Sequence, residues 1–229
     1  MMKAHFDLSD DVWFAGGAWT WIGFTCGNQK TLDTMIPAMQ SVKDFNVQNV
    51  LITLWGDNGK ECSFYSMLPS LYAIKKHYDG ETDTDKIKDG FKAITGEDFD
   101  HMMALDLPNL VAGNTDNEKC ISKHMLYSDP FLGYLDSTVI DGVDKEYFSH
   151  AKTLSEYAKT SKYAYLFESA SALCRVMEIK YGLGAKTRAV YSSGDKSKLN
   201  DLIEDYKTAI SRLDGREMTD DVVNEIFSK

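Results

Sequence analysis

Few residues in the 229-residue sequence could cross-link the chain or anchor it in a membrane. The cysteines stand far apart, so no CxxC pair indicates zinc and no dense framework indicates a small disulfide-stabilised domain. We expect reduced thiols at Cys26, Cys62, Cys120 and Cys174. No stretch of about 18 apolar residues is present, and the N-terminus MMKAHFDLSDD has no apolar signal core. The sequence therefore predicts a soluble, cytoplasmic chain without a membrane span.

Positive charge is scarce as well. The 25 Lys and Arg residues are outnumbered by 35 Asp and Glu residues, which gives a net charge of −10 and a pI near 4.9. No local cluster of basic residues reverses this sign. Such a surface repels the phosphates of nucleic acids and of anionic lipids. We therefore predict no nucleic-acid partner and no membrane partner.

Metal ligands in a recognisable spacing are also absent from the sequence. The histidines form no HExxH motif or similar arrangement, and isolated histidines are more often structural or surface residues than ligands. They are His5, His77, His101, His124 and His150. The sequence predicts no metal site and no cofactor.

The first 80 residues alternate between strand and helix patterns. Two short β-prone runs, residues 12–15 and 50–55, flank a stretch whose apolar residues recur at three- and four-residue steps. Pro37 fits a helix there only in its first turn. A second helix is expected after the second run, opened by a capping box of Asn58 and Glu61. Strand, helix, strand, helix is the unit of a parallel α/β sheet.

An acidic, turn-rich segment at residues 79–85 then marks a domain boundary. Beyond it, apolar residues at helical spacing predict three long helices, at residues 144–160, 161–181 and 197–213. Gly182 and Gly184 are expected to stop the second of them. We therefore predict a mainly α chain with two domains, 1–80 and 81–229. We expect the helical part, about residues 81–213, to fold by itself.

Two segments are denser in glycine and aromatic residues than a scaffold requires. Residues 14–24 read FAGGAWTWIGF and residues 54–61 read LWGDNGKE, and each segment continues past a predicted strand. In a parallel α/β barrel, the carboxyl ends of the strands form the active-site face. A Trp ring stacks on the C–H face of a pyranose, and Asp57, two positions after Trp55, points the same way from a strand. An aromatic ring with a carboxylate indicates a carbohydrate site.

Structural roles also explain these residues. Trp19 and Trp21 are suited to a core, Asp57 to a turn, and Asn58 to a helix cap. We assign Glu61 to the cap rather than to catalysis.

The two segments together resemble the seventh and eighth barrel strands of glycoside hydrolase family 20, in particular the bacterial exo-β-N-acetylhexosaminidases and glucosaminidases with a helical C-terminal domain. Residues 121–133, ISKHMLYSDPFLG, resemble the SK-x-x-LY-x-DP-x-LG stretch of that subgroup. The resemblance runs from about residue 10 to about residue 210. It implies a remnant β-α-β-α unit of a (β/α)8 barrel followed by an α-helical domain.

By this resemblance, Trp55 matches the aromatic residue that lines the pocket of the terminal sugar, and Asp57 matches the acidic residue that accepts hydrogen bonds from sugar hydroxyls. Trp19 and Trp21 fall in the strand-seven loop, where they would form a wall of the pocket. Members of the family use the acetamide oxygen of the substrate as nucleophile, oriented by an Asp, while the adjacent Glu protonates the leaving oxygen. This sequence contains no Asp-Glu dipeptide, so no catalytic residue is predicted in it.

Three functional hypotheses follow. The first is the C-terminal part of a β-N-acetylhexosaminidase, which removes terminal N-acetylhexosamine or glucosamine from glycans, with this chain inactive by itself. The second is a helical dimerisation or interaction module without a catalytic role, and the third is a complete small hydrolase that uses Asp57 and Glu61. Because strands cut from a parallel sheet leave unpaired backbone groups, we also expect a homodimer with residues 10–60 in its interface.

Overall fold

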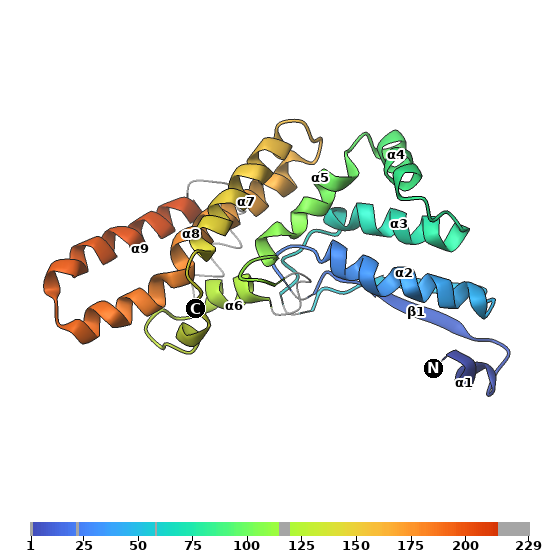
Figure 1. Cartoon of the computed structure of the whole chain (residues 1–229), viewed down its shortest axis with the longest axis horizontal. Helices are drawn as coiled ribbons and strands as arrows, with labels where there is room; N and C mark the ends of the chain where they lie inside the picture. The colour runs from blue at the N-terminus through green and yellow to red at the C-terminus, as the bar shows by residue number, and fades with distance from the viewer. Residues whose placement is uncertain (1, 22, 58, 115–119, 215–229) are drawn as a thin grey trace. The chain divides into compact units, whose positions relative to one another are not determined.

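The computed structural model describes residues 2–21, 23–57, 59–114 and 120–214. Most of these residues are helical, as the sequence predicts (Figure 1). The chain divides into two compact units, of which the first ends at Asp106 and the second begins at Leu107. All four cysteines are free thiols, in agreement with their spacing.

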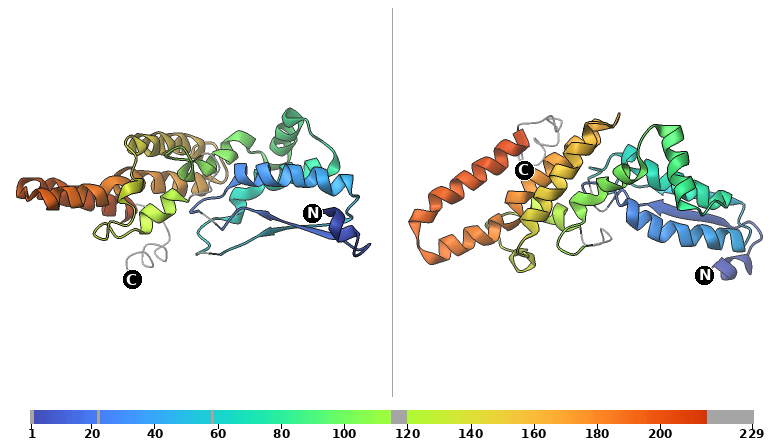
Figure 2. Two further views of the ribbon diagram at one scale, coloured as in Figure 1. Left: turned by 60° about the horizontal axis from the view of Figure 1, so that its bottom comes forward. Right: turned by 45° about the horizontal axis from the view of Figure 1, so that its top comes forward.

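The first unit contains the predicted β-α-β arrangement. After the short helix α1 (Met2–Phe6), β1 (Trp13–Ala18) and β2 (Asn49–Leu54) pair in parallel, and α2 (Asn28–Asp44) connects them (Figure 2). Parallel neighbours need a crossover of this kind, because their equivalent ends lie on the same side of the sheet. The carboxyl ends of both strands, and the segments that follow them, therefore share one edge.

One face of this sheet is covered by α2, and the other, the open face, carries exposed apolar side chains. The covered face packs against α2 around a buried apolar cluster of Met35, Met39, Val42, Val47 and Ile74, with Phe14, Val50 and Ile52 at its margin. Side chains alternate between the faces of a strand, so the neighbours of these strand residues point the other way. Of these, Trp13 is 64% exposed and Leu51 is 52% exposed. Trp13 and Leu51 thus leave apolar surface uncovered on this face.

The helix α2 begins earlier than its proline suggests. Its first residue is Asn28, so Pro37 lies in the helix interior and the expectation that it occupies the first turn is wrong. The start of α2 is fixed by Asp106, whose carboxylate accepts hydrogen bonds from the main-chain N–H groups of Asn28 and Gln29, each at 2.8 Å. A cap supplied from such a distance in sequence is not visible in the local pattern.

The helix after β2 starts later than expected. Residues 59–63 are not helical, a 3-10 turn η1 (Phe64–Met67) follows, and α3 (Leu68–Asp79) carries Pro69 in its first turn. Proline favours that position because its missing N–H would have no partner there. The predicted capping box is therefore wrong for Glu61, which precedes the helix, and its other member, Asn58, lies outside the described residues.

The acidic segment 79–85 separates two helices of the same compact unit. α4 (Thr84–Thr95) begins after Asp83, whose carboxylate accepts hydrogen bonds from the main-chain N–H groups of Asp85 and Lys86 at 3.1 and 3.3 Å. The composition change at these residues thus coincides with a helix cap. The unit continues through α5 (Phe99–Met103) and into η2 (Ala104–Asn109), where the division between the compact units falls.

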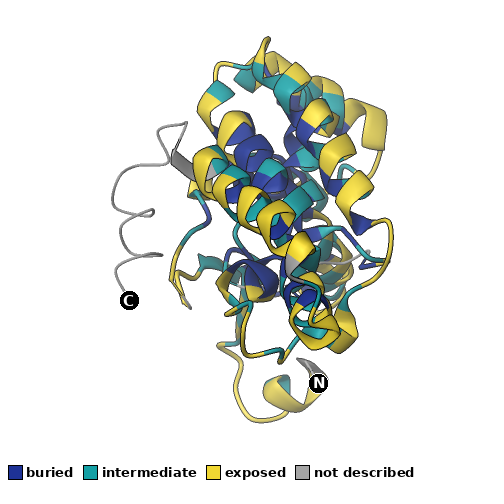
Figure 3. Ribbon diagram, turned by 90° about the vertical axis from the view of Figure 1, so that its left-hand side faces the viewer, coloured by how far each residue is buried: buried dark blue, intermediate teal, exposed yellow. Residues whose placement is uncertain are grey.

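The second unit is built on three long helices, α7 (Val143–Ala158), α8 (Ala164–Ser193) and α9 (Leu199–Asp214). α6 (Ile121–Tyr127) and the short turns η3 (Asp136–Thr138) and η4 (Lys196–Lys198) complete it. Both α7 and α9 pack along α8, and the buried residues gather on the facing sides of these helices (Figure 3). The largest buried side chains of this core include Tyr147, Leu154, Phe167, Met177 and Leu183.

Two glycines do not stop α8 as expected, because the helix runs on to Ser193 and ends at Gly194 in the left-handed conformation. Gly184 instead permits a close approach: a Cβ atom there would lie 3.3 Å from both the Cα and the carbonyl oxygen of Pro130. Gly182 has no neighbour within 4 Å of such an atom. Tertiary packing and the length of the apolar stripe override the tendency of glycine to end a helix at these positions.

Among the described residues, no helix combines the length and apolar character needed to cross a membrane.

Candidate functional site

The four residues predicted to contact a sugar lie at one edge of the two-stranded sheet. Trp19 and Trp21 follow β1, and Trp55 and Asp57 follow β2. Since the strands are parallel, both segments leave the sheet at its carboxyl end. The topology therefore gathers the two segments that the sequence analysis singled out.

Trp19 and Trp21 form a stacked pair. Their ring centroids are 4.7 Å apart with an interplanar angle of 25°. The indole N–H of Trp19 donates to Thr34 Oγ1 at 3.3 Å, and the Nζ of Lys30 lies 5.5 Å from the centroid of the Trp19 ring. Helix α2 thus holds Trp19 from one side. Both rings are half-buried, so each keeps part of its surface for a further contact.

Gly17 makes room for the second ring of the pair. A Cβ atom at Gly17 would lie only 2.7 Å from the Trp21 ring. The glycine is therefore required by the close approach of Trp21 to the strand, and the pair of glycines before the aromatic residues has a steric reason.

Hydrogen bonds connect the segments after the two strands. The Thr20 hydroxyl donates to the main-chain carbonyl of Trp55 at 2.6 Å, and the indole N–H of Trp55 donates to Thr53 Oγ1 at 2.6 Å. The Thr53 hydroxyl in turn donates to the carbonyl of Gly16 at 3.0 Å. This chain of contacts fixes the orientation of Trp55 relative to β1, although its ring is 52% exposed.

Asp57 is exposed, so a ligand in solution can reach its carboxylate. An exposed aromatic ring followed by an exposed carboxylate is an arrangement that can stack on a sugar ring and accept hydrogen bonds from its hydroxyls.

A buried polar cluster lies behind these segments. Asp106, which caps α2, is also 3.2 Å from the thiol of Cys26, measured from Oδ1 to Sγ. Burial raises the pKa of Asp106 to about 6, while the hydrogen bonds from the main chain of Gln29 and Asn28 and from the Cys26 thiol act in the opposite direction. The carboxyl group is thus held in place by donors on the residues that lead into α2.

Asn28 extends this cluster toward the segment after β2. Its side-chain amide donates to the main-chain carbonyl of Ser66 at 3.0 Å, and its oxygen accepts from the Ser70 hydroxyl at 2.7 Å. Sequence reasoning missed Asp106, Cys26 and Asn28 as structural supports of the site. Asp106 is 80 residues from Cys26 along the chain, and no motif joins them.

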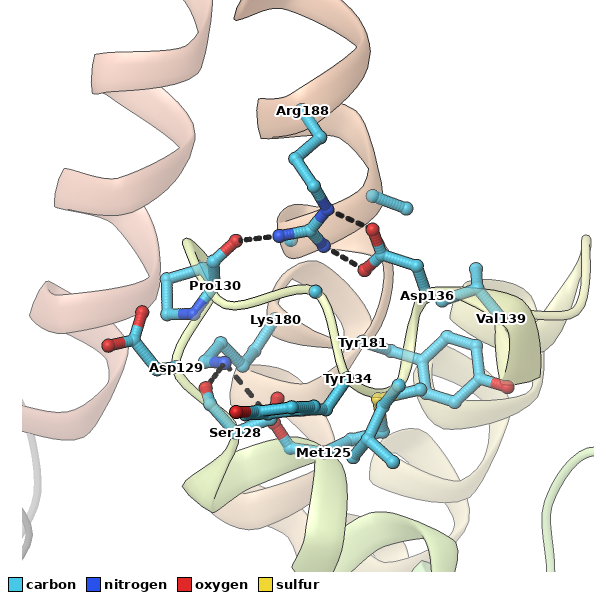
Figure 4. Close-up of a pocket in the computed structure, with 14 residues that line it drawn as sticks. Met125, Ser128, Asp129, Pro130, Tyr134, Asp136, Val139, Lys180, Tyr181 and Arg188 are labelled. Carbon is cyan, nitrogen blue, oxygen red and sulfur yellow. Dashed lines mark hydrogen bonds and ion pairs between the residues drawn. The ribbon is translucent and has the colours of Figure 1, made fainter.

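The SK-x-x-LY-x-DP-x-LG segment, residues 121–133, has a structural role in the second unit (Figure 4). Lys180 of α8 donates to the carbonyls of Met125 and Ser128 at 3.2 and 2.7 Å, and Arg188 donates to the carbonyl of Pro130 at 2.7 Å while it pairs with the carboxylate of Asp136. The cavity among these residues measures about 10 Å³, which is roughly room for one water molecule. The segment therefore fastens a loop to α8 and leaves no space for a sugar.

Metal ligands are not gathered anywhere in the described residues, since no group of three or more His, Cys, Asp or Glu side chains could hold an ion. The arrangement at the sheet edge is one of aromatic rings, hydroxyls and a carboxylate.

Together, the fold and the site define a helical domain preceded by a parallel β-α-β-α unit. Residues 97–220 match the family described as the glycoside hydrolase 20C C-terminal domain. Because the match spans more than half of the sequence, the chain belongs to this family. No curated protein matches the chain. Trp19, Trp21, Trp55 and Asp57 precede the matched residues, so their role remains a prediction.

Proposed function

We propose that the chain is the C-terminal part of an exo-β-N-acetylhexosaminidase. Its first unit would supply the last two β/α units of a (β/α)8 barrel, and its second unit would be the helical domain that follows the barrel. Membership of the glycoside hydrolase 20C C-terminal family supports this assignment. The parallel pairing of β1 and β2, with α2 packed against one face, also supports it, because neighbouring strands of such a barrel are parallel and covered by helices on their outer face.

In this proposal, the edge of the sheet forms one wall of the pocket for a terminal N-acetylhexosamine or glucosamine. The observation that carries it is the hydrogen bond between Thr20 and Trp55, which joins the two segments at the carboxyl end of the strands. Trp55 would stack on the sugar ring, Asp57 would accept hydrogen bonds from its hydroxyls, and Trp19 with Trp21 would close one side.

The chain by itself is expected to hydrolyse no glycoside. The reaction of this family needs an Asp that orients the acetamide and an adjacent Glu that donates a proton, and the sequence contains no Asp-Glu dipeptide. Loss of general acid catalysis alone lowers a rate by about 10² to 10⁴-fold. A chromogenic N-acetylglucosaminide would thus be left intact, whereas turnover abolished by Asp57→Ala would identify the chain as a small hydrolase of its own.

Sugar binding tests the pocket wall directly. Intrinsic tryptophan fluorescence of the full chain is titrated with N-acetylglucosamine, and Trp55→Phe and Asp57→Asn are expected to weaken the response. Trp13→Phe is the matched control, because Trp13 is similarly exposed but lies at the amino end of β1. Equal responses from all three variants would show that the sheet edge is not a sugar site.

The open sheet face favours a second proposal, self-association. Trp13 and Leu51 are exposed on that face, and exposed apolar surface beside unpaired strand edges favours pairing with another copy. A homodimer with residues 10–60 in its interface would cover both. Such pairing is compatible with the second functional hypothesis, a helical interaction module without a catalytic role.

A further inference from the structure

Each of the two segments that carry the proposed site also carries a buried thiol. Cys26 lies between Trp21 and the start of α2, and Cys62 lies between Asp57 and the start of η1. Cys26 is fully buried and Cys62 is 4% exposed. The Asn28 side-chain amide lies 3.0 Å from Cys26 Sγ and 3.0 Å from the Ser66 carbonyl, and the Ser66 hydroxyl lies 3.3 Å from Cys62 Sγ. Two cysteines that are distant in sequence therefore share one buried cluster behind the edge of the sheet.

The surroundings of this thiol pair are polar. The Sγ of Cys26 lies 3.2 Å from Oδ1 of Asp106 and accepts a hydrogen bond from the Asn28 side chain at 3.0 Å. The Sγ of Cys62 lies 3.3 Å from the Ser66 hydroxyl. These groups can orient both sulfur atoms, and the Asp106 carboxylate can take up a proton from the thiol beside it.

The other two cysteines provide a contrast within the same chain. Burial alone raises the pKa of Cys174, and burial is also the main cause of the raised pKa of Cys120. The pKa of Cys62 is instead lowered, above all by the hydrogen bond with Cys26, whereas burial raises the pKa of Cys26. Cys62 is thus the better nucleophile of the pair, since the thiolate is the reactive form.

We propose that Cys26 and Cys62 are a redox-active pair, which peroxide converts into a disulfide that cross-links the two segments of the sheet edge. The inference rests on the burial of both thiols in one polar cluster that contains Asp106, Asn28 and Ser66. It does not depend on the proposed glycosidase function. It requires only that the thiols be oxidised by a small hydroperoxide.

The reaction balances with one molecule of hydrogen peroxide. The Cys62 thiolate attacks one peroxide oxygen, the O–O bond breaks, and the leaving hydroxide takes a proton to become water, which leaves Cys62 as a sulfenic acid. Cys26 then gives its proton to the Asp106 carboxylate, and its sulfur attacks the Cys62 sulfur. The S–O bond breaks, and the departing hydroxide takes the proton from Asp106. Two thiols and one peroxide thus yield one disulfide and two waters.

The cross-link would join the segment with Trp19 and Trp21 to the segment with Trp55 and Asp57. In the reduced protein, hydrogen bonds connect these segments, through Thr20 at the edge of the sheet and through Asn28 and Ser66 behind it. A covalent bond between the same segments would restrict their separate movement. Oxidation would therefore stabilise the sheet edge without the addition of any new side chain.

The test is peptide mapping of the full chain after exposure to hydrogen peroxide. Remaining thiols are alkylated, and the protein is digested without reduction. We expect a peptide pair linked through Cys26 and Cys62, a mass lower by two hydrogens than that of the reduced protein, and restoration of both thiols by dithiothreitol. Cys62→Ser and Cys26→Ser should each abolish the linked pair.

Cys174→Ser is the matched control, because Cys174 is equally buried but lacks the polar cluster. This variant should form the Cys26–Cys62 link as the unaltered chain does, and its thermal midpoint should rise on oxidation to the same extent. Wild-type protein that keeps Cys26 and Cys62 alkylatable under conditions that oxidise the partly exposed Met103 would overturn the proposal. A link that instead involves Cys120 or Cys174 would overturn it as well.

Discussion

The hydroxyl of Thr20 donates a hydrogen bond to the main-chain carbonyl of Trp55, and this bond joins the segments that follow the two parallel strands. Thr20 itself is buried, with 2% of its surface exposed. Replacement by valine keeps the shape of the side chain but removes the donor. We expect Thr20→Val to lower the free energy of unfolding by about 1 kcal/mol, as for a typical lost hydrogen bond, and to weaken the fluorescence response to N-acetylglucosamine.

Chemical denaturation measures the first effect. Thr82→Val is the control, because Thr82 is exposed in the turn before α4 and should be neutral. A Thr20→Val protein as stable as the unaltered chain would mean that the bond contributes nothing to holding the two segments together.

Asp106 should give the first unit a specific pH dependence. The folded-state pKa of about 6 lies above the value of about 3.9 expected for an unfolded Asp. A raised carboxyl pKa means that the folded state holds the proton more tightly, so the stabilisation is complete below the unfolded pKa and is lost as pH rises through the folded pKa. The contribution of Asp106 to the free energy of unfolding should therefore fall by about 3 kcal/mol between about pH 4 and pH 7.

Thermal or chemical unfolding across this pH range would reveal the contribution as a difference between variants. Asp106→Asn is expected to lower stability overall, since an amide cannot accept both main-chain hydrogen bonds, but to remove this part of the pH dependence. Asp44→Asn, at an exposed position of α2, should keep it. Identical pH profiles for Asp106→Asn and the unaltered chain would contradict the assignment.

The two glycines inside α8 should respond differently to alanine. Gly182 has open space around it, so Gly182→Ala is expected to stabilise the helix by about 0.5 to 1 kcal/mol through the lower backbone entropy of alanine in the unfolded state. Gly184→Ala should gain less or lose stability, because the new Cβ would press against Pro130. Equal gains in thermal midpoint for Gly182→Ala and Gly184→Ala would show that the loop at Pro130 shifts without cost to accommodate the new Cβ atom.

Self-association should depend on the open face of the sheet. Leu51→Lys places a charge on that face and is expected to shift the molar mass in light scattering toward the monomer at tens of micromolar protein. Leu8→Lys is the control, since Leu8 is 86% exposed but precedes β1. If the unaltered chain is already monomeric at this concentration, the sheet face does not mediate pairing and the proposed homodimer is wrong.

The sequence predicted the elements whose cause is local and missed those whose cause is remote. Apolar periodicity was sufficient for α2, α7 and α9, and the β-prone runs located β1 and β2. The start of α2 depends on Asp106, and the continuation of α8 past Gly182 and Gly184 depends on packing against Pro130 and α9. Phe148 shows the same limit: it fits the apolar spacing of α7 but is 59% exposed. Patterns along a chain cannot report which neighbours an element will have.

In the candidate site, too, the sequence predicted the residues with local signals and missed the contacts between distant residues. Trp19, Trp21, Trp55 and Asp57 were identifiable from residue type and from their place after predicted strands. Their connection through Thr20, and the buried cluster of Cys26, Asn28 and Asp106, needed coordinates, because each contact joins residues at least 35 positions apart except that between Cys26 and Asn28.

The 30-residue helix α8 packs against both α7 and α9, and the two partners overlap near Arg175, whose carbonyl accepts a hydrogen bond from Arg212 of α9. Its first half packs with α7, where Ser171 donates to the carbonyl of Ala151, and its second half packs with α9, where Thr187 and Tyr206 share a hydrogen bond. Beyond Tyr181, where the ring contact with Tyr147 of α7 lies, the support of α8 comes increasingly from α9. Native-state hydrogen exchange would then find two levels of protection within one continuous helix, because opening of α9 exposes the amides of residues 182–193 to solvent while those of residues 166–177 stay closed.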